Sequence, residues 1–63
     1  MIFIDSNEAF KIAIEAGFLS LSPRAANYAG KYMYMGTNDF PEWSSHQFKH
    51  IMTRKYLPVR VSK

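Results

Sequence analysis

The chain reads NEAFKIAIEAG from Asn7 to Gly17, and this stretch predicts a helix that is apolar around most of its circumference. Phe10, Ala13 and Ile14 recur at helical spacing, and Ile12 lies beside the polar side. The charged side chains form one narrow stripe, made of Glu8, Lys11 and Glu15. A helix with so little polar surface is normally buried. The rest of this short chain is therefore expected to cover it.

Both ends of this helix carry local signals. Asp5 followed by Glu8 has the spacing of a capping box, with the next two residues as alternative caps. Gly17 suits the position after a helix, where the backbone turns left-handed. The predicted helix spans residues 6–16.

A second helix is predicted over residues 23–35. Ser22 can cap it, Pro23 fits the first helical position, and Gly36 ends it. Small residues at helical spacing would allow close packing against the first helix; they are Ala26, Ala29, Gly30 and Met33.

A third helix is predicted over residues 44–56, with Ser44 and Gln47 as a capping box and Pro58 beyond its end. Its apolar stripe consists of Phe48, Ile51, Met52 and Tyr56. The predicted fold class is thus all-α: one compact three-helix domain with short extended termini. Residues 57–63 are expected to form a mobile basic tail. Pairing of Met1–Ile4 with Val59–Val61 in a two-stranded ribbon is a less favoured alternative.

Composition bounds the class of protein. Sixty-three residues make one domain, and without cysteine it has neither disulfides nor thiolate metal sites. One Trp, four Tyr and five Phe are many for so small a core, which favours a homodimer or larger homo-oligomer. The sequence has no signal peptide and no apolar run of about 20 residues, so no membrane association and a cytoplasmic location are expected.

Charge is distributed unevenly along the chain. The net charge is +3, and all five acidic residues precede residue 43. The last third carries only basic residues, which favours a polyanionic partner or an acidic protein surface. The plain alternative is a solvated face that keeps the protein dispersed.

Two candidate surfaces follow from the predicted helices. A protein or oligomer interface is predicted at Ile12, Tyr28, Tyr32, Tyr34 and Met35, because tyrosine and methionine are enriched in interfaces. Nucleic-acid or anion contacts are predicted on the third helix and beyond it, at His46, Lys49, His50, Arg54, Lys55 and Arg60. Three helices ending in a basic one have the layout of a helix-turn-helix protein, although the connectors are longer than usual.

No catalytic, metal or cofactor site is predicted. His46 and His50 are spaced like metal ligands with Glu42 as a third, but the sequence lacks the His-Glu-x-x-His motif. Ser44 and Ser45 next to His46 do not form a nucleophile set, because three short helices offer little sheltered volume. A non-enzymatic role is therefore expected.

As a whole, the chain resembles the small early-region proteins of lambda-like phages that are encoded between the exonuclease and excisionase genes. The likeness rests on the length, the opening MIFIDSNEAF, the three-helix prediction and the lack of a catalytic motif. The resemblance implies a helical accessory protein that influences the lysis–lysogeny choice or the host cell cycle by binding. It carries no functional residue across.

The resulting hypothesis is a small regulatory protein that binds a host or phage protein partner. The alternative is a helix-turn-helix-like protein that binds DNA through its basic third helix.

Overall fold

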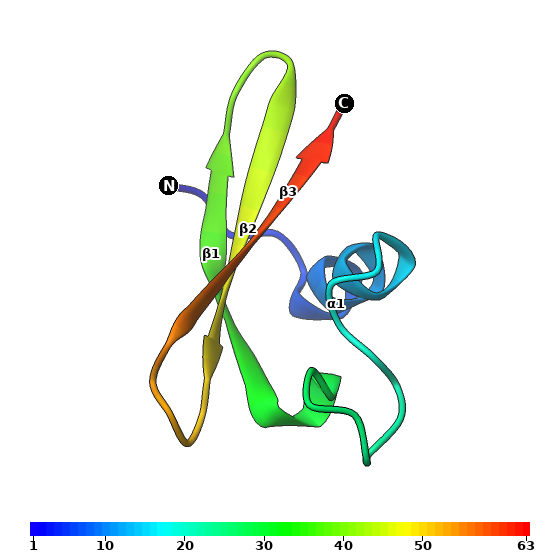
Figure 1. Ribbon diagram of the computed structural model, residues 1–63. Helices are drawn as coiled ribbons and strands as arrows, with labels where there is room; N and C mark the ends of the chain where they lie inside the picture. Colours follow the sequence, from blue (N-terminus) through cyan, green and yellow to red (C-terminus); the bar gives the residue numbers. More distant parts are fainter.

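The structure, a computed structural model, describes residues 1–63 and combines one helix with a three-stranded antiparallel sheet. Helix α1 spans Ser6–Glu15. After a long connection and a 3₁₀ turn at Ala29–Lys31, the chain forms β1 (Tyr32–Asp39), β2 (Trp43–His50) and β3 (Tyr56–Ser62). The strands follow one another in the sheet in sequence order, and α1 lies on one side of it (Figure 1).

The first predicted helix is confirmed by Ser6–Glu15. Asp5 caps its first turn by accepting a hydrogen bond from a backbone N–H at 3.4 Å. Gly17 has a φ of +85°, and the N–H of Phe18 then donates to the carbonyl of Ala13 at 2.9 Å. This is the Schellman arrangement, which satisfies carbonyls that the end of a helix leaves free. The ends of α1 are therefore fixed by local chemistry.

The core lies between α1 and the sheet. Ala9 and Ala13 of α1 are completely buried, as are Phe48 of β2 and Val59 of β3. The ring of Phe10 meets that of Phe48 edge-on, with centroids 4.9 Å apart. Because alanine is small, the helix backbone can approach the sheet closely while Phe48 fills the space between them.

The predicted all-α class is wrong, because residues 23–35 do not form a second helix. Their first part consists of turns and the 3₁₀ turn, and their last part is the start of β1. Tyr32 and Tyr34 lie on one face of β1, and Met33 lies on the other. This alternation is the period of a strand, and aromatic residues favour strands because they pack well on a pleated surface.

The predicted third helix, residues 44–56, is also wrong, since this segment contains most of β2, a turn and the first residue of β3. Ser44 and Gln47 do not form a capping box. Instead, Gln47 Nε2 donates to Ser45 Oγ at 2.7 Å along one face of β2. Pairing of β2 with both neighbours and burial of Phe48 outweigh a local helix signal, whose contribution is small by comparison.

The two ends of the chain lie at the sheet. Ile2 exchanges two backbone hydrogen bonds with Thr37 on the outer edge of β1, at 2.7 and 2.8 Å. The N-terminal residues therefore pair with β1, whereas the alternative ribbon joined them to Val59–Val61. The segment 57–63, for which a mobile tail is expected from the sequence, forms most of β3. Extended termini are thus parts of the sheet.

Candidate functional site

The candidate functional site of this molecule is a surface of the sheet. The molecule has no pocket, and no three or more His, Asp or Glu side chains lie close enough together to share a metal ion. Glu42, His46 and His50, the ligand set weighed from the sequence, are therefore not brought together. No helix of the chain has the length and apolar character needed to span a membrane.

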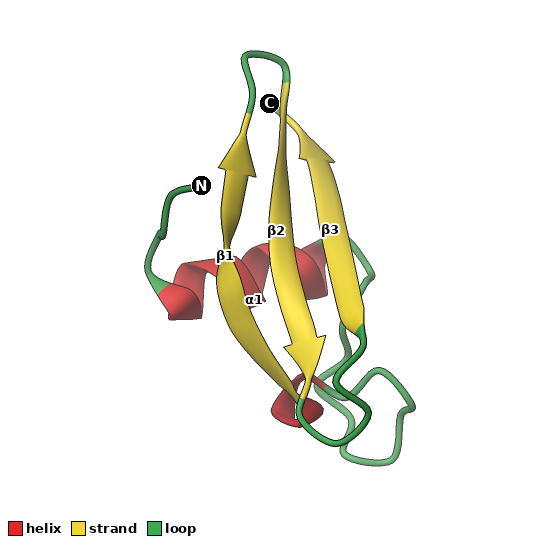
Figure 2. Cartoon of the chain, turned by 90° about the vertical axis from the view of Figure 1, so that its left-hand side faces the viewer, coloured by secondary structure: helices red, strands yellow, loops and turns green.

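One face of the sheet is covered by α1 and the other is open, and Figure 2 shows the strands in front of α1 with no element crossing them. The register defines this open face, because cross-strand partners project from the same side of a sheet. Phe48 and its partner Leu57 face α1, so their neighbours Lys49 and Tyr56 face away. The open face comprises Met33, Gly36, Asn38, Trp43, Ser45, Gln47, Lys49, Tyr56, Pro58, Arg60 and Ser62, of which Gly36 and Ser45 are buried.

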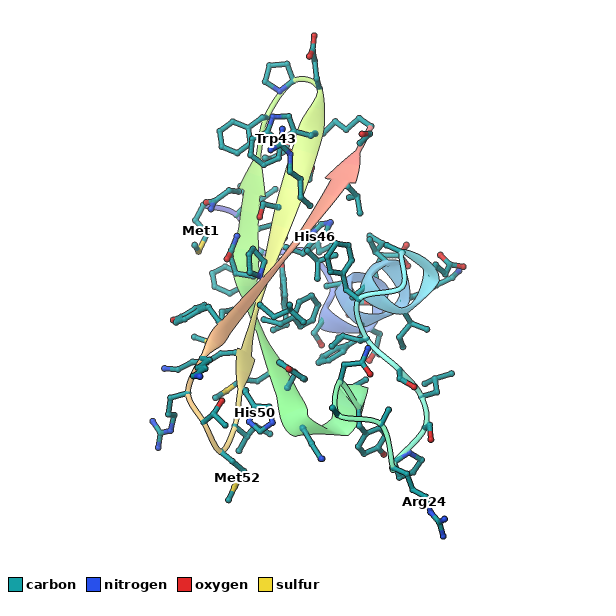
Figure 3. All side chains as sticks on the ribbon, in the orientation of Figure 1. Met1, Arg24, Trp43, His46, His50 and Met52 are labelled. Atoms are coloured by element: carbon teal, nitrogen blue, oxygen red, sulfur yellow. The ribbon has the colours of Figure 1, made fainter.

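Aromatic rings and cations are paired on the open face. The guanidinium carbon of Arg60 lies 3.9 Å from the centroid of the Trp43 ring, and the Phe40 ring is stacked on Trp43 at 4.2 Å. Lys49 Nζ lies 5.4 Å from the centroid of the Tyr56 ring. In Figure 3, Trp43 lies near the β1–β2 turn, and His50 and Met52 mark the opposite end of the sheet. The two ring–cation pairs therefore lie at the two ends of the face.

The charges of the molecule are segregated between its two sides. No position of the open face carries a carboxylate, whereas Lys49 and Arg60 both lie on it. Three of the five acidic residues belong to α1 and its cap; they are Asp5, Glu8 and Glu15. Asp39 forms an ion pair with Lys63 at 2.6 Å, and Glu42 lies in the β1–β2 turn. The open face is thus the basic side of the protein.

His46, a predicted anion contact, is instead a buried residue on the helix side of β2. Only 4% of its surface is exposed, and its Nδ1 lies 2.7 Å from Thr37 Oγ1. Burial lowers the pKa of His46, and the negative charge of Asp39 opposes this in part. The side chain therefore belongs to the core and cannot contact a bound anion.

His50 also has a structural role. Its Nδ1 accepts hydrogen bonds from the N–H groups of Met52 and Thr53, each at 3.1 Å, and so holds the β2–β3 turn. Its ring meets the ring of Tyr32 edge-on, with the ring centroids 5.0 Å apart.

The other predicted cations divide into two groups. Lys49 and Arg60 share the open face, and Arg54 and Lys55 lie in the exposed β2–β3 turn.

The predicted protein interface is dispersed in the structure. Tyr32 and Tyr34 are half-buried on the helix side of the sheet, where they pack against the core. Ile12 is half-buried on α1, Tyr28 precedes the 3₁₀ turn with its ring against Gly30, and Met35 is half-buried at a bulge in β1. These side chains do not make one exposed patch.

Sequence reasoning missed Trp43 and Tyr56 of the open face and Phe40 of the β1–β2 turn, whose ring is stacked on Trp43. The signal that could have found them is the alternation in β2, where Trp43 and Lys49 belong to one face and His46 and Phe48 to the other. Comparison with known proteins adds no family to these observations: no protein-family model, no curated protein and no solved structure matches this chain.

Proposed function

We propose that this chain is a small, non-enzymatic nucleic-acid-binding protein and that the open face is its binding surface. The observation that carries the proposal is the composition of that face, on which aromatic rings and cations lie together without a carboxylate. Tyr56 and Arg60 are exposed, and Trp43 and Lys49 are half-buried. Cations attract the phosphate backbone, and aromatic rings provide surfaces for bases.

The electrostatic part of this argument rests on Lys49 and Arg60. Both lie on the open face, and both already lie against an aromatic ring. The carboxylates of α1 lie on the far side of the sheet, so they repel a polyanion less than carboxylates beside the binding surface would. A polyanion would therefore bind best on the face opposite α1.

The route to this function differs from the helix-turn-helix alternative that the sequence suggested. That alternative required a basic third helix in the major groove, and the segment concerned forms most of β2, the β2–β3 turn and the first residue of β3. The expectation of a basic nucleic-acid contact is kept as a proposal, and we propose it for the open face of the sheet. The surface residues of the proposal are Phe40, Trp43, Lys49, Tyr56 and Arg60.

The test is an equilibrium titration of a fluorescently labelled oligonucleotide with the protein at about 50 and 200 mM salt. Affinity is expected to fall steeply with salt, because bound cations release counterions from the phosphates. Arg60→Gln is expected to weaken binding and to reduce the slope of log K against log salt by about 0.7–0.9, the value for one lost phosphate contact.

The matched control is Lys11→Gln, which removes the same charge from the exposed surface of α1. It should leave the affinity and the salt slope close to those of the wild type. Absence of binding at 50 mM salt would refute the proposal. Equal effects of Arg60→Gln and Lys11→Gln would also refute it, because attraction would then depend on net charge alone.

A protein partner on the same face is the second candidate function. Trp43, Tyr56 and Arg60 are of the residue types that dominate binding energy in protein interfaces, and Tyr56 is 57% exposed. Such a complex would depend little on salt if its centre were the aromatic rings. A salt-insensitive complex that is lost in Tyr56→Ala would favour this candidate over nucleic acid.

Three sequence-based expectations stay predictions within this proposal. They are a role as a phage early protein in lysis–lysogeny development, self-association into a homodimer and residence in the host cytoplasm. A nucleic-acid-binding role is compatible with all three. Sedimentation of the purified protein over a range of concentrations tests the second directly.

A further inference from the structure

We infer that the nucleic acid bound by the open face is single-stranded and that it lies along β2 with bases stacked at both ends of the face. This inference rests on the proposed function and adds to it the form of the ligand. The observations that carry it are the separation of the two ring–cation pairs and the polar side chains between them.

The first stacking position is at Trp43. Arg60 lies over one face of its ring at 3.9 Å, and Phe40 is stacked on the other face at 4.2 Å with an angle of 26° between the ring planes. Stacking of a base on an aromatic ring is stronger than an exposed cation–π contact. A base can therefore replace the guanidinium over Trp43, and Arg60 is then free to pair with the adjacent phosphate.

The second stacking position is at Tyr56, at the other end of the face. The ring is 57% exposed, and Lys49 Nζ lies 5.4 Å from its centroid. Lys49 is the cross-strand partner of Tyr56 and lies six residues beyond Trp43 on β2. At ~3.3 Å per residue the two positions are about 20 Å apart. Each position thus combines one ring for a base with one cation for a phosphate.

Between the two positions lies the half-buried amide of Gln47, next to the buried hydroxyl of Ser45. Gln47 Nε2 donates to Ser45 Oγ at 2.7 Å, which orients the amide and leaves its oxygen free to accept. An amide oxygen of this kind can bond a base edge that is not engaged in base pairing. The face therefore offers stacking, edge contacts and phosphate contacts in one row along a single strand.

A duplex cannot use this arrangement. Its base faces are stacked on one another, so exposed rings on a sheet would find no base to contact, and only the phosphates would remain. Aromatic side chains on the open face contribute to affinity only when the bases are unpaired. Binding of a duplex would rest on Lys49 and Arg60 alone.

The test compares a single-stranded DNA 12-mer with the duplex of the same sequence, using label anisotropy and the fluorescence of the sole tryptophan, Trp43. The single strand is expected to bind at least tenfold more tightly and to quench Trp43. Tyr56→Leu is expected to lower single-strand affinity by about 5- to 150-fold, the range for one stacked base, and to leave duplex affinity unchanged. Tyr56→Phe keeps the ring and should bind like the wild type.

Circular dichroism of Tyr56→Leu has to match that of the wild type, and Trp43→Leu provides the same test at the other position. Equal affinity for single strand and duplex, together with unchanged binding by both leucine variants, would overturn the inference. If Arg60→Gln weakened both ligands in that case, the proposed function would stand. If neither ligand bound at low salt, the proposed function would fail and the inference with it.

Discussion

Thr37 Oγ1 lies 2.7 Å from His46 Nδ1, and this pair ends a hydrogen-bond chain that begins at the N-terminal segment. The N–H of Ile4 donates to the hydroxyl of Tyr34 at 3.1 Å, and that hydroxyl bonds Thr37 Oγ1. Either oxygen of the Tyr34–Thr37 pair can be the donor, and Nδ1 of His46 accepts from Thr37 when the chain of donors starts at Tyr34. Burial of His46 favours its neutral ring in the folded protein, and a neutral ring has one nitrogen that can accept a hydrogen bond.

Stability is expected to fall as the pH is lowered from 7.5 to 5. Burial lowers the pKa of His46 below its ordinary value of 6.5, so the unfolded chain binds this proton more readily than the folded one. The contribution to stability is complete above about pH 6.5 and is lost as the pH falls through the lower folded pKa. Urea unfolding at several pH values measures the effect.

The matched variant is His46→Gln, whose amide oxygen can accept from Thr37 without titrating. It should flatten the pH dependence between 7.5 and 5, and an unchanged slope would contradict the assignment. Asp39 does not interfere in this range. Its hydrogen bonds from Lys63 and Ser44 lower its pKa below 3.8, so the stability it contributes is lost only at still lower pH.

Phe48 is the side chain whose loss the fold should tolerate least. It is fully buried and contacts α1 through Phe10. Truncation of a buried Phe to Ala costs about 3–5 kcal/mol, and a domain of this length has roughly 3–9 kcal/mol in total. Phe48→Ala is expected to be largely unfolded at 25 °C by circular dichroism. Phe40→Ala, at an exposed ring, should remain folded, and comparable losses in both variants would contradict this view of the core.

The first helix was predictable from the sequence because its signals are local. Asp5 and Gly17 act within one helical turn of the residues that they cap, and neither needs a distant partner. Ala13, which the helical spacing predicts on the apolar side, is fully buried, as is Ala9 one turn before it. The sequence therefore determines both the ends and the inward face of this element.

The strands were not predictable in this way, because the burial of a strand residue depends on residues from other elements of the fold. Phe48 is buried by Tyr34 and Leu57 on neighbouring strands and by α1, all distant in sequence. The bulge between Tyr34 and Gly36 further shifts the alternation, so that Tyr34 and Thr37 share a face. A regular period of two is thereby interrupted in β1.

The candidate site was only partly predictable for the same reason. Lys49 and Arg60 could be named as anion contacts from charge alone, and both lie on the open face. His46 belonged to the same predicted set, but it lies one residue before Gln47 of the open face and therefore faces the buried side of the sheet. Adjacent residues of a strand face opposite sides of the sheet, so the strand register decides which cationic side chains can reach a ligand.

Gly36→Ala is expected to destabilise the protein and to release the N-terminal segment. Gly36 has a φ of +119°, and a Cβ there would lie 2.6 Å from Met1 Sδ and 3.2 Å from Phe3 Cζ. The backbone strain alone costs about 1–3 kcal/mol. Hydrogen exchange of the Ile2 and Thr37 amides, which pair with each other, should accelerate.

Gly17→Ala is the control that distinguishes backbone strain from the steric clash with Met1. Gly17 also has a positive φ, but nothing lies within 4 Å of an added Cβ. It should lose about 1–2 kcal/mol without selective exchange at Ile2. If Gly17→Ala released Ile2 as strongly as Gly36→Ala, the contact of Gly36 with Met1 would not be what holds the segment.

Pro58 is expected to protect the outer edge of β3. The hydrogen bonds from His50 N–H to Lys55 and from Lys63 N–H to Glu42 fix the ladder between β2 and β3. Because hydrogen-bonded pairs recur at every second residue, Pro58 and its partner Gln47 form a pair without backbone hydrogen bonds. The backbone nitrogen of Pro58 therefore points away from β2, and as a proline it offers no N–H to another strand.

Pro58→Ala restores this donor, so the variant should stay folded but sediment as larger species than the wild type at equal concentration. Ser62→Ala changes an exposed residue of the same strand without adding a donor, and its sedimentation should match the wild type. Unchanged sedimentation of Pro58→Ala would mean that the edge of β3 is not a site of strand pairing. Ile2 covers the edge of β1, so self-association of the wild type would then have to involve a face of the sheet.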